Sequence, residues 1–436
     1  MTRNSALIHA VAVAAILAGC GRAGSTPQAE RPASPACQAA LAPGGHGRPI
    51  DRTIADLQAR AAQPTRKREV LEQLGNQFVI RARVANDPGD YTLAERVATC
   101  LDEEHPGDPA ALLLRGHALH QLHRFAEAEA VARTLVTKRE FVLDYALLGD
   151  ALMEQGRLTE AAAAYQRMID LKPFYQSYTR AAHLRWLTGD LDGAIELVKK
   201  AIDAASPRNP EAIAWAYTRL GFYELQRGDL NRSAQAVDAA LSFEPDYAAA
   251  LMTRGRVLLA RDRPDEAVRA LERAANLNPL PEYQWILADA LRVRGLEPEA
   301  ASVERRVMQD GPRSDPRTLA LFLATRRVDQ AQALVLTERE LTVRGDVFTE
   351  DARAWALLAA GRLADARGAM ARALSQHTRD ARLFLHAGAI AISTGRRADA
   401  RRWFSRADAL RWTLLPSELD LLRRYRFVSS PTHAGE

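Results

Sequence analysis

Small residues recur in this sequence at intervals of about 34 positions, and this period limits the possible folds more than any other feature. The apolar residues around them follow helical spacing, which is broken at regular intervals by Gly, Pro or Asp. The clearest unit spans residues 142–175, with Gly149 in its first helix, Gly156 at the turn, and Ala161 and Pro173 in and after its second. Because one helical pair cannot bury its apolar face alone, the period predicts a solenoid of stacked helical hairpins.

Further units keep the same phase, with small residues where paired helices cross and large residues between successive hairpins. They cover residues 109–142, 175–208, 214–247, 248–281, 281–314, 347–380 and 381–414. The pattern resembles the tetratricopeptide repeat (TPR) family over most of residues 68–414. The resemblance implies an all-α, right-handed α-solenoid of about ten hairpins, in which each hairpin contacts mainly its neighbours.

Two segments depart from the repeat. In the first unit, Ala94 comes about two helical turns late, so we expect an elongated first helix over residues 66–86. Residues 315–346 lack the regular spacing of small residues and predict an irregular, truncated hairpin.

The ends of a solenoid need polar outer faces, which capping helices provide. Residues 51–63 predict such a helix at the N-terminal end. Residues 416–427 predict another at the C-terminal end, with Ser417 as its N-cap. The solenoid is therefore expected over residues 50–428, with a short tail at 429–436.

The first twenty residues carry the most specific short motif in the chain. An apolar run from Ala6 to Ala18 is shorter than the roughly 20 residues that span a bilayer, but it suits the core of a signal peptide. It ends in Leu17-Ala18-Gly19-Cys20, which resembles the lipobox of bacterial lipoproteins. The resemblance implies a signal peptide at residues 1–19 and an acylated, membrane-anchoring Cys20; the alternative is an ordinary secretory signal with a chance cysteine.

Residue 21 is Gly, so the Asp that retains enterobacterial lipoproteins in the inner membrane is missing. We therefore expect an outer-membrane lipoprotein whose solenoid faces the periplasm. Residues 20–49 are rich in Pro, Ala and Gly and have no apolar period, which predicts a flexible tether.

Once Cys20 is acylated, Cys37 and Cys100 are the remaining cysteines in a compartment that is normally oxidising. They could form a disulfide or remain two free thiols, and the sequence leaves both possibilities open. Cys100 is expected to face outward, because Leu101 takes the neighbouring inward position on its helix.

The chain contains no P-loop, zinc-protease, serine-hydrolase or dithiol motif. Gly19, Gly21 and Gly24 match the dinucleotide motif G-x-G-x-x-G, but they lie across the expected cleavage site with no strand before and no helix after, so the match is accidental. The chain's net charge of +5, from 59 basic and 54 acidic residues, is too small to suggest nucleic-acid binding. We therefore expect no enzyme activity, no cofactor and no small-molecule substrate. The alternative is an envelope enzyme or metal-dependent sensor that uses the shared helix face of His117 and His120, with Asp150 from the next hairpin. Exposed or partly buried polar side chains are the favoured interpretation of these histidines, and no metal ligand is assigned.

In TPR domains the first helix of each hairpin lines the concave surface, and one stripe of positions contacts the ligand. The resemblance implies that this stripe comprises His117, His120, Asp150, Met153, His183, Trp186, Trp215, Phe222, Met252, Arg256, Trp285, Asp289, Arg292 and Trp355. Its four tryptophans are expected to be partly exposed and to contact a partner, although some could instead pack between hairpins. The Lys/Asn positions with which some family members hold a C-terminal carboxylate are missing, which favours an apolar or aromatic segment. The function expected is a membrane-anchored scaffold or adaptor for proteins or peptides.

Overall fold

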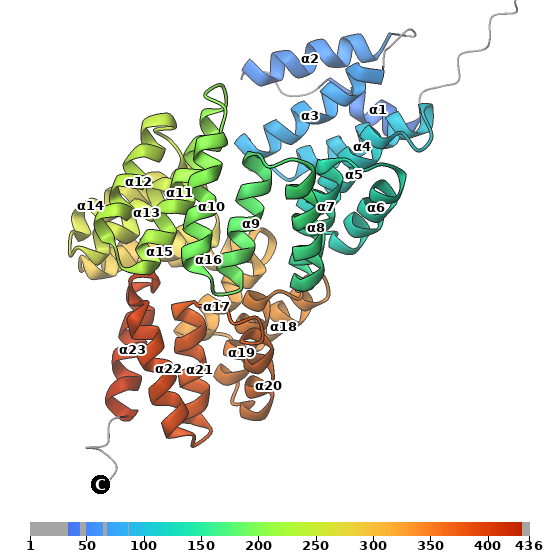
Figure 1. Cartoon of the computed structure of the whole chain (residues 1–436). Helices are drawn as coiled ribbons and strands as arrows, with labels where there is room; N and C mark the ends of the chain where they lie inside the picture. Colours follow the sequence, from blue (N-terminus) through green and yellow to red (C-terminus); the bar gives the residue numbers. More distant parts are fainter. Residues whose placement is uncertain (1–33, 44–48, 64–67, 86, 430–436) are drawn as a thin grey trace, which may run out of the picture.

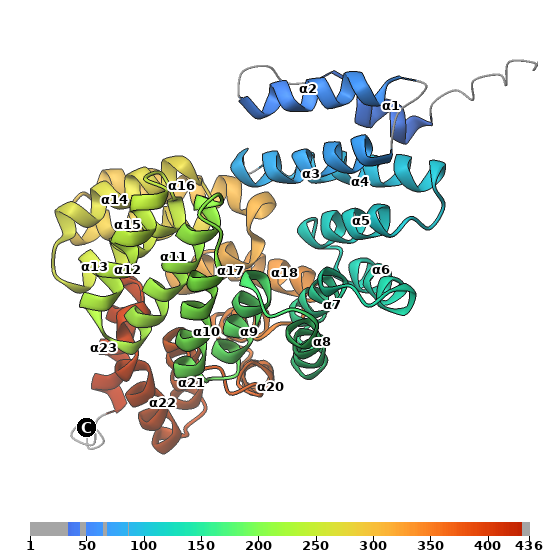
Figure 2. The ribbon, with the colours of Figure 1, turned by 45° about the horizontal axis from the view of Figure 1, so that its top comes forward.

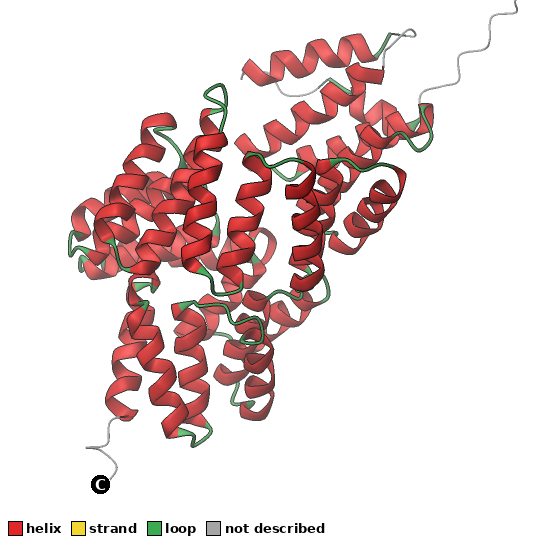
Figure 3. Cartoon of the chain, in the orientation of Figure 1, coloured by secondary structure: helices red, strands yellow, loops and turns green. Residues whose placement is uncertain are grey.

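The computed structural model describes residues 34–43, 49–63, 68–85 and 87–429. Within these ranges the regular structure is entirely helical, as Figure 3 shows, and ten successive helical hairpins form a solenoid. The hairpins are α3 (Arg68–Ala85) with α4 (Gly89–Glu104), α5 (Pro109–Gln121) with α6 (Phe125–Lys138), α7 (Val142–Glu154) with α8 (Leu158–Leu171), α9 (Tyr175–Leu187) with α10 (Leu191–Ala204), α11 (Pro210–Arg227) with α12 (Leu230–Phe243), α13 (Ala248–Ala260) with α14 (Pro264–Leu277), α15 (Pro281–Val293) with α16 (Glu297–Ser314), α17 (Pro316–Arg326) with α18 (Gln330–Leu341), α19 (Val347–Ala359) with α20 (Leu363–Ala373), and α21 (Ala381–Ser393) with α22 (Arg397–Ala409). The prediction of an all-α solenoid of about ten hairpins is confirmed.

Helices α1 (Pro35–Leu41) and α2 (Pro49–Ala61) precede the hairpins, and the short 3-10 helix η1 (Arg411–Thr413) and α23 (Pro416–Ser429) follow them. Ile54 and Leu57 on α2 are buried, and so is Leu422 on α23, so both terminal helices close the core with their apolar faces. Ser417 does not cap α23 as expected, because it lies inside the helix and binds Asp289 of α15.

Helix crossings inside the hairpins depend on the small residues of the repeat. A Cβ atom at Gly149 would collide with the ring of Tyr165, and one at Gly388 would collide with the ring of Phe404. Both aromatic side chains are buried, so neither ring has room to move away. The glycine position of the repeat is therefore set by the closest approach of the two helices.

The turn inside most hairpins holds one residue with a positive φ angle. Glycine occupies this place in six hairpins, as Gly156, Gly189, Gly228, Gly295, Gly361 and Gly395. In two others the place is taken by His123, with a φ of 58°, and by Asp262, with a φ of 57°. Residues with a Cβ are strained in this left-handed region, so these two turns are less stable than their glycine counterparts.

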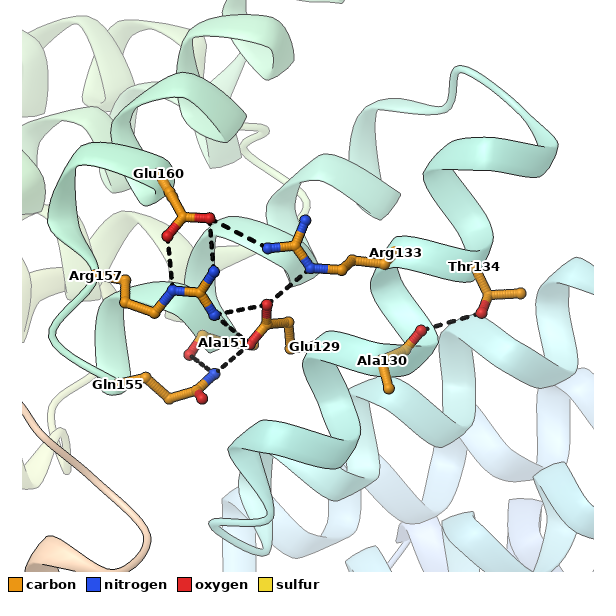
Figure 4. A network of polar contacts seen from close by, with 8 residues as sticks. All are labelled: Glu129, Ala130, Arg133, Thr134, Ala151, Gln155, Arg157 and Glu160. Carbon is orange, nitrogen blue, oxygen red and sulfur yellow. Dashed lines mark hydrogen bonds and ion pairs between the residues drawn. The ribbon is translucent and has the colours of Figure 1, made fainter.

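Ion pairs connect neighbouring hairpins where the second helices begin, as Figure 4 shows for α6 and α8. Arg157 donates to Glu160 of its own helix at 2.6 Å and to Glu129 of α6 at 2.7 Å. Glu129 also accepts from Arg133 at 2.8 Å and from Gln155 at 2.9 Å, so one carboxylate joins two hairpins. These side chains are largely solvent-exposed apart from Glu129, so the network adds orientation more than stability.

The C-terminal hairpins fold back against the middle of the solenoid, while α1–α4 extend away from it (Figures 1 and 2). Helix η1 contacts α11 and α13, and α23 contacts α15. The backbone N–H of Gly345 donates to the carbonyl of Glu154 at 3.2 Å, and Arg256 donates to the carbonyl of Thr413 at 2.9 Å. Hairpins therefore contact mainly their neighbours, as expected, and the region between α7 and α23 adds a smaller set of contacts between distant hairpins.

The same closure appears in the loop between α20 and α21. The hydroxyl of Thr378 donates a hydrogen bond to the carbonyl of Leu187, which lies 191 positions earlier in the sequence. Gln226 donates to the carbonyl of Arg379. These bonds fix the loop against the C-terminal ends of α9 and α11. The solenoid is therefore closed on itself rather than open along its concave side.

Part of the predicted tether is folded. Residues 35–41 form α1, where Ser34 caps the helix and where Cys37 and Ala40 are buried against α4. The sulfurs of Cys37 and Cys100 are bonded, so Cys100 is fully buried and the expectation that it faces outward is wrong. A helix of seven residues is too short to show an apolar period, which explains why the composition concealed it.

The predicted signal peptide, Cys20 and most of the C-terminal tail lie outside the described residues. None of the helices in the described ranges is both long enough and apolar enough to cross a bilayer.

Candidate functional site

A cavity of about 570 Å³ lies where the inner helices of the middle hairpins face those of the C-terminal hairpins. Helices α7, α9, α11, α13 and α15 contribute one wall, and α17, α19 and α21 contribute the other. The loops before α19 and α21 complete the enclosure. The cavity therefore exists because the solenoid closes on itself.

One side of the cavity is aromatic. The indole of Trp186 on α9 stacks on Phe348 of α19 with ring centres 5.6 Å apart, and on His183 at 5.4 Å. Phe222 of α11 meets the same indole edge-on at 5.9 Å. The indole N–H donates to the side-chain oxygen of Gln226 at 2.6 Å, which fixes the orientation of the ring.

The other side of the cavity is built from ion pairs between helices. Arg256 on α13 pairs with Glu282 on α15 at 3.1 Å. Three further pairs are Arg317 with Asp346 at 3.1 Å, Arg372 with Glu350 at 2.6 Å, and Arg344 with Glu154 at 3.4 Å. The pair of Arg372 and Glu350 lies within the hairpin of α19 and α20, whereas the other three join different hairpins or loops and so help to hold the closed arrangement together.

His183 is half-buried and borders the cavity beside Trp186. Burial, together with the positive charge of Arg219, lowers the pKa of His183 to about 3. The imidazole is therefore neutral at physiological pH, with one nitrogen able to donate and the other able to accept.

Five of the predicted stripe residues do line this cavity: Met153, His183, Trp186, Phe222 and Arg256. The other nine do not: His117, His120, Asp150, Trp215, Met252, Trp285, Asp289, Arg292 and Trp355. The cavity thus takes five residues from the central hairpins of the predicted stripe, leaves out Trp215 and Met252 between them, and excludes both ends.

The expected exposure of the tryptophans is wrong for three of the four. Trp186, Trp285 and Trp355 are only 6%, 1% and 4% exposed, whereas Trp215 is half-buried. Trp355 stacks on His386 with ring centres 4.0 Å apart, and its N–H donates to Thr325 at 3.0 Å. Trp186 is covered by Phe348 of the folded-back α19, whereas Trp285 and Trp355 pack against the adjacent hairpins, as the alternative interpretation had it.

Asp289 and Arg292 of α15 bind neighbouring elements instead of lining the cavity. Asp289 is buried, accepts from the backbone N–H of Ser417 at 2.9 Å, and also pairs with Arg326 of α17. Arg292 pairs with Glu304 of its own hairpin. Both residues therefore serve the packing of α15 against α16, α17 and α23.

The histidines of α5 do not converge on a third ligand. Asp150 is engaged by Arg180 at 2.7 Å and by the hydroxyl of Tyr165 at 2.7 Å. Burial lowers the pKa of His117 to about 4, and the neighbouring charge of His120 adds to this effect. Among the described residues, the three potential metal ligands that do lie together are Cys37, Cys100 and Glu104, and the two sulfurs are bonded to each other.

Sequence reasoning missed Arg219 and Phe348, which both border the cavity. Arg219 lies one turn from Phe222 on the same face of α11, so helical spacing could have predicted that it borders the same site as Phe222. Phe348 begins α19 and reaches Trp186 only because the C-terminal hairpins fold back. No local signal in the sequence indicates that contact.

Several solved structures are similar to the chain, at low identity. Yeast Tom70 matches with 15% identity and a TM-score of 0.38, over 87% of this chain and 92% of that one. The Cut9–Hcn1 complex of the APC/C matches with 14% identity and a TM-score of 0.40, over 86% and 81%. YrrB, described as a TPR protein with an unusual peptide-binding site, matches with 15% identity and a TM-score of 0.32, over 46% and 98%. No curated protein matches the chain.

The family assignment comes from the sequence model of the tetratricopeptide repeat. It matches residues 81–141, 146–210, 218–279, 252–315 and 352–413, which together make up well over half of the chain. These ranges contain the hairpins whose small residues lie at helix crossings, so sequence model and packing agree. The chain belongs to the tetratricopeptide repeat family.

Proposed function

We propose that this chain is a membrane-anchored TPR lipoprotein that acts as a protein–protein interaction scaffold in the bacterial cell envelope. It binds a peptide or protein segment at the inner surface of its middle hairpins. The observation that carries the proposal is the convergence of Met153, His183, Trp186 and Phe222 from three different hairpins on one cavity. Aromatic and Met side chains around a concave site are typical of sites that recognise apolar segments.

The anchor follows from the lipobox at residues 17–20. Two or three acyl chains at Cys20 would bind a membrane firmly, because each buried methylene contributes about 0.8 kcal/mol. The bond between Cys37 and Cys100 supports an exported location, since structural disulfides persist in oxidising compartments and are rare in the cytosol. We place the solenoid at the outer membrane, facing the periplasm.

A scaffold role is favoured over catalysis by the nature of the side chains around the cavity. The carboxylates that border it are engaged in ion pairs or helix caps, as with Glu282, Glu350 and Asp380. Asp150, which could have completed a metal site with His117 and His120, is held by Arg180. This arrangement fixes charges in place, as a rigid binding surface requires.

Site-specific photocrosslinking in living cells tests the proposal directly. A photoreactive phenylalanine analogue replaces Phe222 at the cavity or, as the matched control, Phe243 on the outer helix α12, where the ring is 43% exposed. We expect covalent protein adducts from position 222 and none of the same size from position 243. Adducts at position 243 alone, or at neither position, would contradict binding at the inner surface.

A further inference from the structure

The charges around the cavity are balanced with one exception. Arg256, Arg317, Arg344 and Arg372 each have a carboxylate partner, and Arg382 pairs with Glu418 of α23. Arg219 borders the same cavity, yet no carboxylate of the described residues lies within ion-pair distance of it. A half-buried guanidinium without an anion is costly, so this position calls for an explanation.

Arg219 is held in place by aromatic rings. Its guanidinium carbon lies 4.9 Å from the ring centre of Tyr223, 5.3 Å from that of Phe222 and 5.5 Å from that of Trp186. These contacts stabilise the cation and restrict its motion. They leave its hydrogen bonds largely unused: one nitrogen donates to the Tyr223 hydroxyl at 3.2 Å, and the buried Nε has no hydrogen-bond partner.

An anion would complete this site. A guanidinium offers five N–H donors in a planar fork that suits a carboxylate or a phosphate. His183, stacked on the same indole, adds a neutral ring nitrogen on the cavity wall. Met153, Trp186 and Phe348 provide apolar walls beside the cation.

We propose that the cavity binds a small organic anion, whose carboxylate or phosphate is held by Arg219 and whose apolar body packs against Trp186, Phe222 and Phe348. The volume of about 570 Å³ lies within the range of sites for small molecules. This role goes beyond the scaffold function, and because the anion and a bound protein segment would share Trp186 and Phe222, the two would compete for the cavity. It adds a small-molecule ligand where the sequence motifs indicated none.

Ligand-observed NMR and calorimetry on the purified full chain test the proposal without any protein partner. The probes are phenylacetate for the carboxylate, phenyl phosphate for the phosphate, and phenylacetamide as their neutral counterpart. We expect at least one anion to bind with a Kd in the low millimolar range or below, and phenylacetamide to bind at least tenfold more weakly. The tighter anion identifies the charged group that the site prefers.

Variants of the arginine separate the site from general surface charge. Arg219→Gln should weaken anion binding at least tenfold, and Arg219→Lys, which keeps the charge but loses the fork, should give an intermediate Kd. Arg208→Gln, in the exposed loop before α11, is the matched control and should bind like the wild type. Melting curves and circular dichroism establish that each variant is folded.

Three results would overturn the inference. One is the absence of binding by either anion at about 10 mM, well above the expected Kd. Another is equal binding of phenylacetamide. The third is wild-type affinity in a folded Arg219→Gln variant. If that variant unfolds, the corresponding result is wild-type affinity in Arg219→Lys, with the same preference between phenylacetate and phenyl phosphate as the wild type. None of these depends on the crosslinking result, so the two proposals fail separately.

Discussion

The turn residue of each hairpin shows how a single backbone angle shapes this fold. Glycine tolerates the positive φ without strain, whereas Asp262 adopts it with a Cβ and an exposed side chain. At Gly395 an added Cβ would meet nothing within 4 Å, so backbone conformation alone decides the outcome of substitution there. The two positions form a matched pair.

We predict that Asp262→Gly raises the free energy of unfolding by about 0.5–1 kcal/mol and that Gly395→Asp lowers it by about 1 kcal/mol. The reason is the strain of a Cβ at positive φ, which the first change removes and the second introduces. Denaturant titration followed by circular dichroism measures both. Effects of the same sign in the two variants would contradict the shared turn geometry.

His183 makes stability depend on pH. Its pKa is lowered to about 3 in the folded chain, whereas an unfolded histidine titrates near 6.5, so the folded state binds fewer protons between these values. Its contribution to stability is therefore fully present above about pH 6.5 and is lost as the pH falls towards 3. The slope from this one group is at most about 1.4 kcal/mol per pH unit.

We predict that His183→Gln reduces the loss of stability between pH 6.5 and pH 4, because the variant has no imidazole to protonate on unfolding. Denaturation midpoints at a series of pH values provide the measurement. The variant need not match the wild type in absolute stability, since the slope is what is compared. An unchanged slope would show that His183 is protonated in the folded chain.

Among the elements, the hairpins were predictable and the contacts between distant hairpins were not. Gly149 and Ala161 recur in phase because helix crossings need small residues, so each hairpin is specified by its own residues. Helix α1 escaped detection because seven residues carry no period and its burial depends on α4. In the same way, five stripe residues reach the cavity, whereas Phe348 joins them only through the tertiary fold.

The disulfide fastens α1 to α4 across 63 positions of sequence. In the chain-entropy model, a loop of this length corresponds to about 4 kcal/mol of stabilisation. We predict that Cys37→Ser lowers the stability of the N-terminal hairpins by up to this amount and frees α1 for proteolysis. Limited proteolysis and melting curves, with and without reductant, measure the effect.

Reductant should bring the wild type to the behaviour of the Cys37→Ser variant and leave the variant unchanged. Identical protease sensitivity of oxidised wild type and variant would mean that packing alone holds α1. In that case Ala36 and Ala40, which are both buried, would be sufficient to dock the helix.

For the molecule as a whole, the proposed lipid anchor at Cys20 would determine where the solenoid works. We predict that the wild type sediments with membranes and that Cys20→Ser either releases the protein or leaves its signal peptide uncleaved. Cell fractionation and the apparent mass of the mature chain provide the readout. Unchanged mass and membrane association in the Ser variant would contradict acylation at Cys20.

Closure of the solenoid is the central claim, because the cavity and both proposed roles depend on it. Bonds from Thr378 to Leu187 and from Gln226 to Arg379 place the loop before α21 against the C-terminal ends of α9 and α11. Thr188 and His377 flank this junction, and both are exposed. The native cysteines of the described chain, Cys37 and Cys100, are bonded and would not compete for a thiol reagent.

The most direct test is therefore an intramolecular crosslink in a chain carrying Thr188→Cys and His377→Cys, treated with a short bismaleimide at low protein concentration. The closed solenoid predicts efficient joining of positions 188 and 377 within one molecule, detected by mass spectrometry of the linked peptides. The control pair, Thr188→Cys with Arg401→Cys on the outer helix α22, should be labelled but not joined. Labelling of both cysteines in the first chain without a crosslink would contradict closure, and with it the existence of the cavity.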